Sequence, residues 1–337
     1  MKVCQVLAGN EDGGLEKHTI ELTKQLAKKD VDVTVIAHKD FSQYFKDVNF
    51  ISLDLSKGRK NLFILYKLFK ILNENKFDII HTQANKATDM VIKLKPFLKA
   101  KIVSTLHSYK KNLKSFERSD FVITVSNKIG EKLKNKNKKT IYNGIEYKEL
   151  SNIDVVYDKY EIPRDKFFVC SVGRLCNVKR FDILIKSLKD LDVYCILVGD
   201  GENKEDLVKL AKNEKVYEKI KFTGNIENED VKKILTISDL FIITSDKEGF
   251  PYVFVESLLY KTAVISTDVS DIKEIIGDKY IIDFNNPLIL NKRIHDFKNN
   301  YEKETESFNS IFTYSQNKFT INNMIEETLS IYKEVLK

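Results

Sequence analysis

The stretch Thr244–Glu256, TSDKEGFPYVFVE, carries two glutamates eight positions apart across the junction of an expected strand and an expected helix. The apolar run 240–244 indicates a buried strand, and Pro251 suits the first position of a helix. Glu248 would then lie in the loop above the strand. Glu256 would lie about 1.5 turns into the helix, roughly 7 to 8 Å further along. The two carboxylates are therefore expected on either side of a helix start.

The helix start is a candidate binding feature in its own right. Its first amides, near Gly249 and Phe250, have no partner inside the helix and carry partial positive charge. One ligand can offer a phosphate to these amides and hydroxyl groups to both carboxylates, which describes a nucleotide sugar. The alternative is an ordinary strand–helix unit with one surface glutamate and one helical glutamate. Two glutamates alone favour that alternative, whereas the surrounding Gly-Phe-Pro and the matches below favour a ligand.

Residues 248–267, EGFPYVFVESLLYKTAVIST, resemble the signature of glycosyltransferase family 4, a large group of nucleotide-sugar transferases with the two-domain GT-B fold. The resemblance implies that Glu248 contacts the donor sugar and that Glu256 holds the ribose hydroxyls. It also places Gly249, Phe250 and Pro251 beside the donor.

Strand-like and helical patterns alternate along the whole chain, for example in the helical pattern 15–28. Such alternation predicts an α/β fold with a parallel, doubly wound sheet in each half. Ligands of these sheets bind beyond the carboxyl ends of the strands, so two facing sheets would place the active site in the cleft between them. The expected strands are 3–8, 31–37, 50–53, 78–82, 101–105 and 121–125 in the first half, and 167–172, 193–198, 220–223, 240–244 and 263–267 in the second.

Two Rossmann-like domains are expected, with a boundary in the polar stretch 143–163. Residues 1–150 would form an acceptor-binding domain and residues 160–314 a donor-binding domain, as the GT-B resemblance implies. The resemblance further implies that a C-terminal helix, at about 315–337, crosses back onto the first domain near Tyr332.

A basic pair follows the strand 167–172, in the segment GRLCNVKRFDILI at 173–185. This segment resembles the family pattern in which an arginine and a lysine bind the donor diphosphate, and those positions fall on Arg174 and Lys179. Cations are needed there because the leaving nucleoside diphosphate gains negative charge as the glycosidic bond breaks. The alternative is two surface cations in a chain that has 56 basic residues.

The first strand runs into the segment AGNEDGGLEKH at 8–18, in which a Gly13-Gly14 pair opens a helix. Glycine lets the backbone approach a ligand closely, and a helix start favours a phosphate. The family resemblance places this pair near the donor phosphates and the acceptor. Glu16 and His18 follow on the helix and are acceptor-side candidates, although a capping role for Glu16 is an equal alternative.

Two histidines stand near strand ends. His107, in STLHSYK, matches the family's first-domain histidine near the transferred sugar, where an imidazole can donate a hydrogen bond or alter the local charge. With Glu248, Arg174 and Lys179 it forms the candidate catalytic group. His81, in DIIHTQAN, is an acceptor-side candidate. The alternative for each histidine is a structural role at a strand end.

The nucleotide base has its own candidate contacts. The segment FTGNIEN follows the strand 220–223, where the family wraps main chain around the base. Asn225 and Ile226 are therefore donor-binding candidates through their backbone atoms.

Departures from the family pattern follow Glu256. Lys261 and Ala263 stand in a turn where the family usually has a small residue or glycine and then proline, and Ser270-Asp271 replaces a common Gly-Gly. Lost glycines can change how a loop approaches the donor sugar, and Asp271 is unfavourable beside a diphosphate unless it faces hydroxyl groups.

No metal or other cofactor is expected. Two acid pairs, Asp30-x-Asp32 and Asp190-x-Asp192, resemble those of metal-dependent transferases, but both stand at the amino ends of strands, the wrong edge for a ligand. No Gly-Lys-Ser/Thr phosphate loop occurs.

The composition favours a cytoplasmic protein. No apolar run of about 18 residues occurs, and the start MKVCQVLAGN lacks the regions of a signal peptide. The four cysteines lack metal-ligand spacing and are expected to be free thiols.

The net charge of +7 is unevenly divided, because residues 1–150 hold 29 Lys+Arg against 17 Asp+Glu, whereas the remainder holds 27 against 32. A basic first half suggests an acidic acceptor or peripheral contact with an anionic membrane surface. The alternative is genomic base composition that favours lysine and asparagine. A nucleic-acid partner is not expected.

The expected function is transfer of a hexose-type sugar from a nucleoside diphosphate sugar, with a UDP-sugar as the favoured donor. The expected acceptor is a glycan or glycolipid of lipopolysaccharide, capsule or lipid-linked oligosaccharide type. The resemblance implies retention of configuration. The alternatives are a noncatalytic nucleotide-sugar-binding subunit and a GT-B nucleotide-sugar epimerase.

Overall fold

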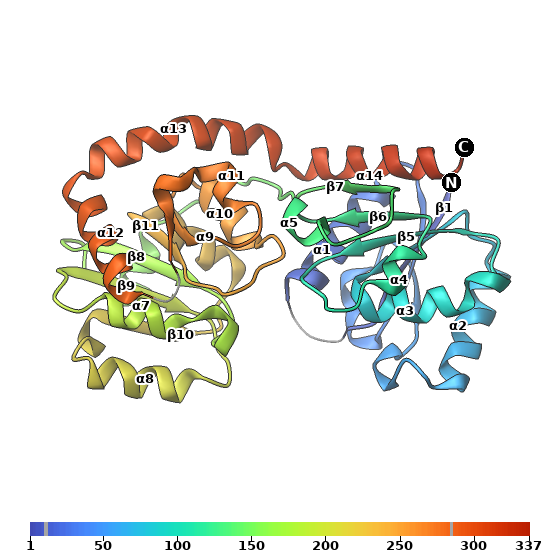
Figure 1. The fold of residues 1–337 in the computed structure, drawn as a ribbon, viewed down its shortest axis with the longest axis horizontal. Helices are drawn as coiled ribbons and strands as arrows, with labels where there is room; N and C mark the ends of the chain where they lie inside the picture. Colours follow the sequence, from blue (N-terminus) through green and yellow to red (C-terminus); the bar gives the residue numbers. More distant parts are fainter. Residues whose placement is uncertain (10–12, 284–285) are drawn as a thin grey trace. The chain divides into compact units, whose positions relative to one another are not determined.

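The computed structural model describes residues 1–9, 13–283 and 286–337, and the chain divides into two compact units (Figure 1). Unit 1 comprises residues 1–144 and 319–337, and unit 2 comprises residues 145–318. The bounds expected from the sequence were 1–150 with about 315–337, and 160–314.

Unit 1 contains a parallel sheet of seven strands in the order β3-β2-β1-β4-β5-β6-β7. Helices α2 and α3 pack on one face through Leu65, Leu68 and Met90, and α1 and α14 pack on the other through Leu22 and Met324. The strands are β1 (Lys2–Leu7), β2 (Asp32–Ala37), β3 (Asn49–Ser52), β4 (Ile79–Gln83), β5 (Lys101–Leu106), β6 (Phe121–Thr124) and β7 (Lys138–Thr140). The helices are α1 (Gly14–Ala27), α2 (Leu62–Glu74), α3 (Ala84–Leu94), α4 (Lys114–Glu117), α5 (Asn127–Gly130) and α14 (Ile321–Val335).

Unit 2 contains a parallel sheet of six strands in the order β10-β9-β8-β11-β12-β13. Its helices form two groups, one with α7, α8 and α12 and the other with α9, α10 and α13. The strands are β8 (Phe167–Val172), β9 (Val193–Val198), β10 (Ile220–Gly224), β11 (Leu240–Ile243), β12 (Val264–Thr267) and β13 (Ile281–Ile282). The helices are α6 (Val155–Lys159), α7 (Phe181–Ser187), α8 (Lys204–Asn213), α9 (Asn228–Ile237), α10 (Tyr252–Leu259), α11 (Ile272–Ile276), α12 (Pro287–Asn299) and α13 (Tyr301–Lys318).

The predicted α/β class with a doubly wound sheet in each half is confirmed. In both sheets the first strand of the unit lies inside the sheet, and the strand order reverses beside it. Two strands were not predicted, β7 and β13. The first carries Lys-Lys-Thr without an apolar run, and the second has only two residues, so neither produces a periodic signal.

The C-terminal segment forms two helices, not the single helix predicted from about residue 315. Thr320 separates α13 from α14 because its Oγ1 accepts a hydrogen bond from the amide of Asn323 (3.1 Å), which caps the new helix. Gly144 lies against this start: a Cβ there would stand 2.2 Å from the carbonyl oxygen of Thr320. Helix α14 belongs to unit 1, as the predicted return of the C-terminal helix requires.

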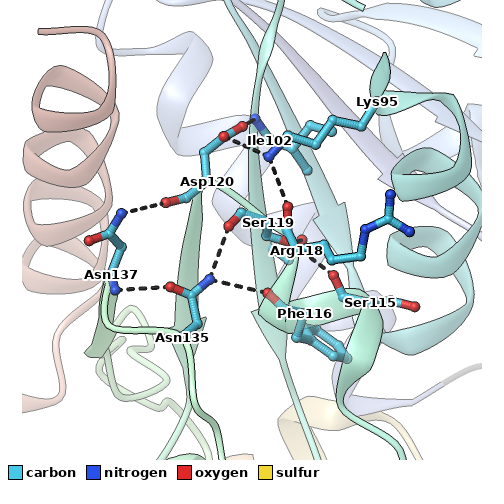
Figure 2. Close-up of polar contacts among 10 residues, drawn as sticks. Lys95, Ile102, Ser115, Phe116, Arg118, Ser119, Asp120, Asn135 and Asn137 are labelled. Carbon is cyan, nitrogen blue, oxygen red and sulfur yellow. Dashed lines mark hydrogen bonds and ion pairs between the residues drawn. The ribbon is translucent and has the colours of Figure 1, made fainter. Parts of the chain in front are cut away.

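The amino ends of β5 and β6 are held by a polar cluster around Asp120 (Figure 2). One Asp120 oxygen accepts from the amide of Ile102 (2.7 Å), and the other pairs with Lys95 (2.7 Å). Asn137 donates to the backbone oxygen of Asp120 (3.1 Å), and Asn135 donates to that of Ser119 (3.0 Å). The cluster lies at the edge opposite the carboxyl ends, so it stabilises the sheet away from the candidate site.

Two further features concern the whole chain. Cys4, Cys170 and Cys195 are buried free thiols, and burial raises the pKa of Cys170 to about 12. Across residues 1–9, 13–283 and 286–337, every helix is too short or too polar to cross a bilayer.

Candidate functional site

Lys179 and Glu248 meet at the point where the strand order of unit 2 reverses. Lys179 ends a short 3-10 helix, Asn177–Lys179, in the loop after β8, and Glu248 lies in the loop after the neighbouring strand β11. Lys179 Nζ lies 2.6 Å from Glu248 Oε1, and the two side chains are 21% and 12% exposed. In doubly wound sheets this crevice is where ligands bind.

The two loops that carry this ion pair are bonded to each other. Thr244 Oγ1 donates to the backbone oxygen of Lys179 (2.9 Å), and the amide of Asp246 donates to that of Val178 (2.8 Å). Ser245 Oγ donates to Glu248 Oε1 (2.6 Å), the same oxygen that faces Lys179. The carboxylate is therefore preorganised by a hydroxyl and an ammonium group before any ligand binds.

Glycines bring the loops after β8 and β9 into close contact. A Cβ on Gly199 would lie 2.1 Å from the carbonyl oxygen of Gly173, and one on Gly201 would lie 2.5 Å from that of Leu175. The turn at Gly199–Gly201 thus supports the loop that carries Arg174. Arg174 is exposed on that loop, five positions before Lys179.

Helix α10 holds Glu256 on its buried side. Pro251 is the residue that precedes the helix, one position before its predicted place at the first turn. Glu256 is 3% exposed, and its Oε1 lies 3.5 Å from Asn228 Nδ2. Phe250 is buried and packs edge-on against Phe254, with ring centroids 5.8 Å apart, so it anchors the loop before the helix.

The segment that contains Gly249 is tied to the loop after β12, because the backbone oxygen of Gly249 accepts a bond from Ser270 Oγ. Ser270 has a φ of 55° and Lys261 a φ of 61°, both left-handed. At these two departures from the family pattern the backbone keeps a shape that glycine adopts most easily. Ala263 and Asp271 are both buried.

Asn225 and Ile226 directly follow β10 at the same carboxyl edge of the unit 2 sheet. Asn225 is exposed and Ile226 is half-buried. The structure therefore collects Arg174, Lys179, Asn225, Ile226 and Glu248 at one edge of one sheet.

Unit 1 has a cavity at its own strand-order reversal, between the carboxyl ends of β1 and β4. The cavity measures about 420 Å³. Three cations line it, Arg59, Lys86 and Lys110, against a single carboxylate among the described lining residues, that of Glu16. The remaining lining residues are Ala8, Gly9, Gly14, Leu15, Gln83, Ala84 and Asn85.

His107 follows β5 and is held by the floor of this cavity. Its Nε2 lies 2.8 Å from Gln83 Oε1, and Gln83 Nε2 donates to Gln5 Oε1 (2.9 Å). Because an amide oxygen only accepts, His107 Nε2 carries the proton and Nδ1 keeps a lone pair. Burial lowers the pKa of His107 well below its usual value, and the nearby imidazoles of His18 and His81 lower it further. His107 is therefore neutral near pH 7.

His18 lies beside His107, with ring centroids 4.7 Å apart in an edge-on arrangement. Its Nδ1 is 3.1 Å from Asn143 Oδ1, and burial lowers its pKa to about 4. Glu16 is buried at the third position of α1 and turns back towards the glycines before the helix: a Cβ on Gly13 would lie 3.3 Å from its Oε2. This position suits the capping alternative as well as a site role.

The sequence suggested that His81 lies at a strand end. In the structure it lies inside β4, where it is completely buried. Its Nδ1 lies 2.6 Å from the hydroxyl of Tyr332, and its Nε2 lies 2.6 Å from Thr105 Oγ1. Both ring nitrogens are thus used inside the unit. The side chain has no exposed surface for an acceptor in this structure, and its place in the core fits the alternative of a structural histidine.

The two acid pairs lie at amino ends of strands, as the sequence indicated. Asp32 begins β2, and Asp192 precedes β9 and pairs with Lys166 (2.9 Å) and Lys298 (3.3 Å). Within the parts of the chain that the structure describes, no three His, Cys, Asp or Glu side chains come together as a metal site.

Two doubly wound units, one with a lysine–glutamate pair at its strand-order reversal and the other with a histidine at its carboxyl edge, have the architecture of the GT-B nucleotide-sugar transferases. Residues 12–149 match the family model Glycosyltransferase Family 4, and residues 153–310 match the model Glycosyl transferases group 1. The chain belongs to glycosyltransferase family 4, a family of retaining enzymes.

Relatives and solved structures match from about four fifths of the chain to its whole length. The O-antigen biosynthesis glycosyltransferase WclY of Escherichia coli is 25% identical over 100% of this chain and 99% of its own length. The lipopolysaccharide core biosynthesis glycosyltransferase LpsE of Rhizobium meliloti is 27% identical over 79% of each chain. A crystal structure of Anabaena HepE with UDP and glucose shares the fold, with a TM-score of 0.85 at 18% identity, over 99% of this chain and 100% of that one.

Proposed function

We propose that the protein transfers a hexose-type sugar from a UDP-sugar to a glycan or glycolipid of lipopolysaccharide, capsule or lipid-linked oligosaccharide type, with retention of configuration. The observation that carries this proposal is the Lys179–Glu248 pair at the strand-order reversal of unit 2, with Arg174 on the same loop as the lysine. The UDP in a HepE structure supports the nucleotide, and the names of the WclY and LpsE relatives support the acceptor class.

Each donor group has a partner in the proposed site. Arg174 and Lys179 hold the diphosphate, and Glu248 accepts hydrogen bonds from the sugar hydroxyls. Glu256 holds the ribose hydroxyls from α10, and the backbone at Asn225 and Ile226 borders the base. Because Lys179 already faces Glu248, the carboxylate also keeps the ammonium in place for the phosphate.

The proposed reaction breaks the bond between the anomeric carbon and the diphosphate oxygen, and the electron pair goes to that oxygen. The cations at 174 and 179 stabilise the charge that develops there. The acceptor hydroxyl forms the new bond on the same face of the sugar and gives its proton to the leaving phosphate. His107, neutral with a proton on Nε2, acts as a hydrogen-bonding group near the sugar rather than as an acid.

The acceptor site in this proposal is the unit 1 cavity at the ends of β1 and β4. Its lining by Arg59, Lys86 and Lys110 favours an acceptor that carries a negative group, since three cations face one described carboxylate. Glu16, His18 and the Gly13-Gly14 backbone border the acceptor hydroxyl. A cytoplasmic location completes the proposal, and the buried free thiols agree with a reducing compartment.

The experiment is a comparison of variants in donor binding and in transfer. Radiolabelled UDP-sugars are incubated with a membrane extract and with wild type, Glu248→Gln or Arg174→Ala, and UDP binding is measured by thermal shift. We expect transfer to fall roughly 10²- to 10³-fold in each variant. The matched controls Glu274→Gln and Arg164→Ala, at exposed positions of unit 2, should keep wild-type rates.

Two outcomes would replace the proposal. Wild type that binds UDP but neither transfers nor hydrolyses any UDP-sugar would be a noncatalytic binding subunit. Conversion of a UDP-sugar into its isomer, without an acceptor product, would identify an epimerase.

A further inference from the structure

Helix α2 presents an unusual outer face. Its buried side consists of Ile64, Leu65, Leu68 and Leu72, as expected for a helix packed on a sheet. The opposite side should be polar, yet Leu62 is 80% exposed and Phe63 and Tyr66 are each 63% exposed. Figure 1 shows α2 at the periphery of unit 1, beside α3.

Lysines are interleaved with these apolar side chains. At 100° per residue, Leu62, Tyr66, Lys70, Phe63 and Lys67 fall in this order on one arc of about 140°. We call this arc the α2 face. Lys67 Nζ lies 4.3 Å from the centre of the Phe63 ring, so the ammonium and the aromatic ring form one surface.

The cationic character extends over the segment around the α2 face. Residues 54–74 contain five basic residues against two acidic ones, Asp54 and Glu74. Three of the five precede the helix, at Lys57, Arg59 and Lys60, and all three are exposed. Lys57 and Lys70 make long ion-pair contacts with Asp54 and Glu74, respectively (3.8 Å each).

A second element enlarges the apolar part. Phe97 is 68% exposed at the end of the 3-10 helix Lys95–Phe97, and its ring lies edge-on to Phe69 of α2, with centroids 6.2 Å apart. Lys95 holds this helix in place through Asp120 and the backbone oxygen of Arg118 (2.8 Å) (Figure 2). Phe97 therefore adjoins the α2 face on a fixed support.

We propose that the α2 face docks unit 1 on an anionic lipid membrane, with Leu62, Phe63, Tyr66 and Phe97 entering the headgroup region and the lysines pairing with lipid phosphates. Exposed aromatic and aliphatic side chains with interleaved lysines are the composition of interfacial helices. Each lysine near an anionic surface adds attraction that falls within a Debye length.

Charge decides against a second copy of the chain as the occupant. A symmetric dimer would bring the same patch of both subunits together. Residues 54–74 carry five basic against two acidic residues, so each copy would bring a net charge of +3 against the same charge on its partner, and the two faces repel. An anionic surface lacks this conflict.

The position of the α2 face gives the docking a purpose, and this step rests on the proposed function. Arg59, which lines the candidate acceptor cavity, lies only three residues before α2. Docking of α2 would place that cavity at the lipid surface, where an anionic headgroup of a glycolipid acceptor is available to Arg59, Lys86 and Lys110.

The test measures binding of the full chain to vesicles of phosphatidylcholine alone and of phosphatidylcholine mixed with phosphatidylglycerol, by co-sedimentation at low and high salt. Wild type should bind the mixed vesicles, more weakly in high salt. Lys67→Gln/Lys70→Gln should bind roughly 10- to 30-fold more weakly. Leu62→Gln/Phe63→Gln/Tyr66→Gln should lose at least about tenfold. Exposed sites and glutamine's helix propensity should preserve the fold.

Matched controls lie in unit 2. Leu288→Gln/Ile289→Gln removes two exposed apolar side chains from α12, and Lys186→Gln/Lys209→Gln removes two exposed lysines from α7 and α8. Both should bind vesicles as wild type does. Thermal shift with UDP, measured on every variant, should be unchanged, so that failure of docking is distinguished from failure of the donor site.

Three results would overturn the proposal. Wild type could fail to bind the mixed vesicles, or the α2 variants could bind as tightly as the controls. Sedimentation analysis without lipid could also show a dimer that the α2 variants abolish, and that result would identify a second copy as the occupant.

Discussion

Lys261 occupies a position in which most side chains are strained. Two backbone hydrogen bonds close the C-terminal end of helix α10. The amide of Lys261 donates to the backbone oxygen of Leu258 (3.2 Å), and the amide of Thr262 donates to the backbone oxygen of Ser257 (2.8 Å). This is a Schellman motif, whose central residue is left-handed and usually glycine. The lysine adopts that conformation with a φ of 61°. Ser270 is also left-handed, but its hydroxyl gains a bond to Gly249.

Lys261→Gly should therefore stabilise unit 2. Removal of the Cβ relieves the left-handed strain, and part of this gain is offset by the greater freedom of glycine in the unfolded chain. The expected rise in the free energy of unfolding is about 0.5 to 1 kcal/mol, measured by urea denaturation. Lys261→Ala is the matched control, since it removes the same exposed chain but keeps the Cβ. An equal gain from alanine would show that strain is not the cause.

Besides its apolar packing, helix α14 is hydrogen-bonded to the unit 1 sheet through Tyr332. The completely buried Tyr332 hydroxyl accepts from Gln5 Nε2 (3.1 Å) and lies 2.6 Å from His81 Nδ1. Gln5 also accepts from Gln83, the partner of His107. The C-terminal helix thus contributes to a hydrogen-bond chain that ends at the carboxyl edge of β5.

Tyr332→Phe should destabilise unit 1 by about 1 to 3 kcal/mol, because it leaves Gln5 and His81 with fewer buried partners at once. The free energy of unfolding is the measured quantity. Tyr44→Phe, the same change at a 40% exposed position of this unit, should stay within about 0.5 kcal/mol. A loss in Tyr332→Phe no larger than in this control would show that the hydroxyl does not hold the helix.

Elements with a strong local period could be predicted from the sequence, whereas contacts between distant elements could not. Phe167–Val172 and Val193–Val198 were predicted to the residue, because both are predominantly apolar runs of strand length. The Lys179–Glu248 pair joins loops 69 positions apart, and only the strand order brings them together.

The contacts of α14 and the exposed face of α2 could not be predicted from the sequence either. The hydrogen bonds of Tyr332 with Gln5 and His81 depend on which face of the sheet the last helix covers. No local sequence pattern predicts that face. The sequence of α2 is apolar on both sides, so only its packing on the sheet shows which of its residues remain exposed.

The titratable imidazoles of the whole molecule are concentrated in unit 1. His18, His81 and His107 are neutral there because burial lowers the pKa of each, to about 4 for His18 and about 3 for His81. Unit 2 has one histidine, His295, which is 59% exposed. Below pH 6.5 the unfolded chain binds protons that folded unit 1 excludes. The free energy of unfolding of unit 1 therefore decreases as the pH is lowered.

The stabilisation from these imidazoles should be complete above pH 6.5 and should be lost progressively as the pH falls towards 4, by up to about 1.4 kcal/mol per pH unit for each histidine. Unit 2 lacks this contribution.

Because the chain has no tryptophan, Tyr44→Trp and Tyr217→Trp each report the unfolding of one unit by fluorescence. Between pH 7.5 and 5, the urea midpoint of the Tyr44→Trp reporter should fall further than that of the Tyr217→Trp reporter. Adding His81→Gln to the Tyr44→Trp chain should reduce the pH dependence while lowering the midpoint at pH 7.5. Parallel shifts of both reporters, or an unchanged pH dependence in His81→Gln, would exclude the buried imidazoles as the source.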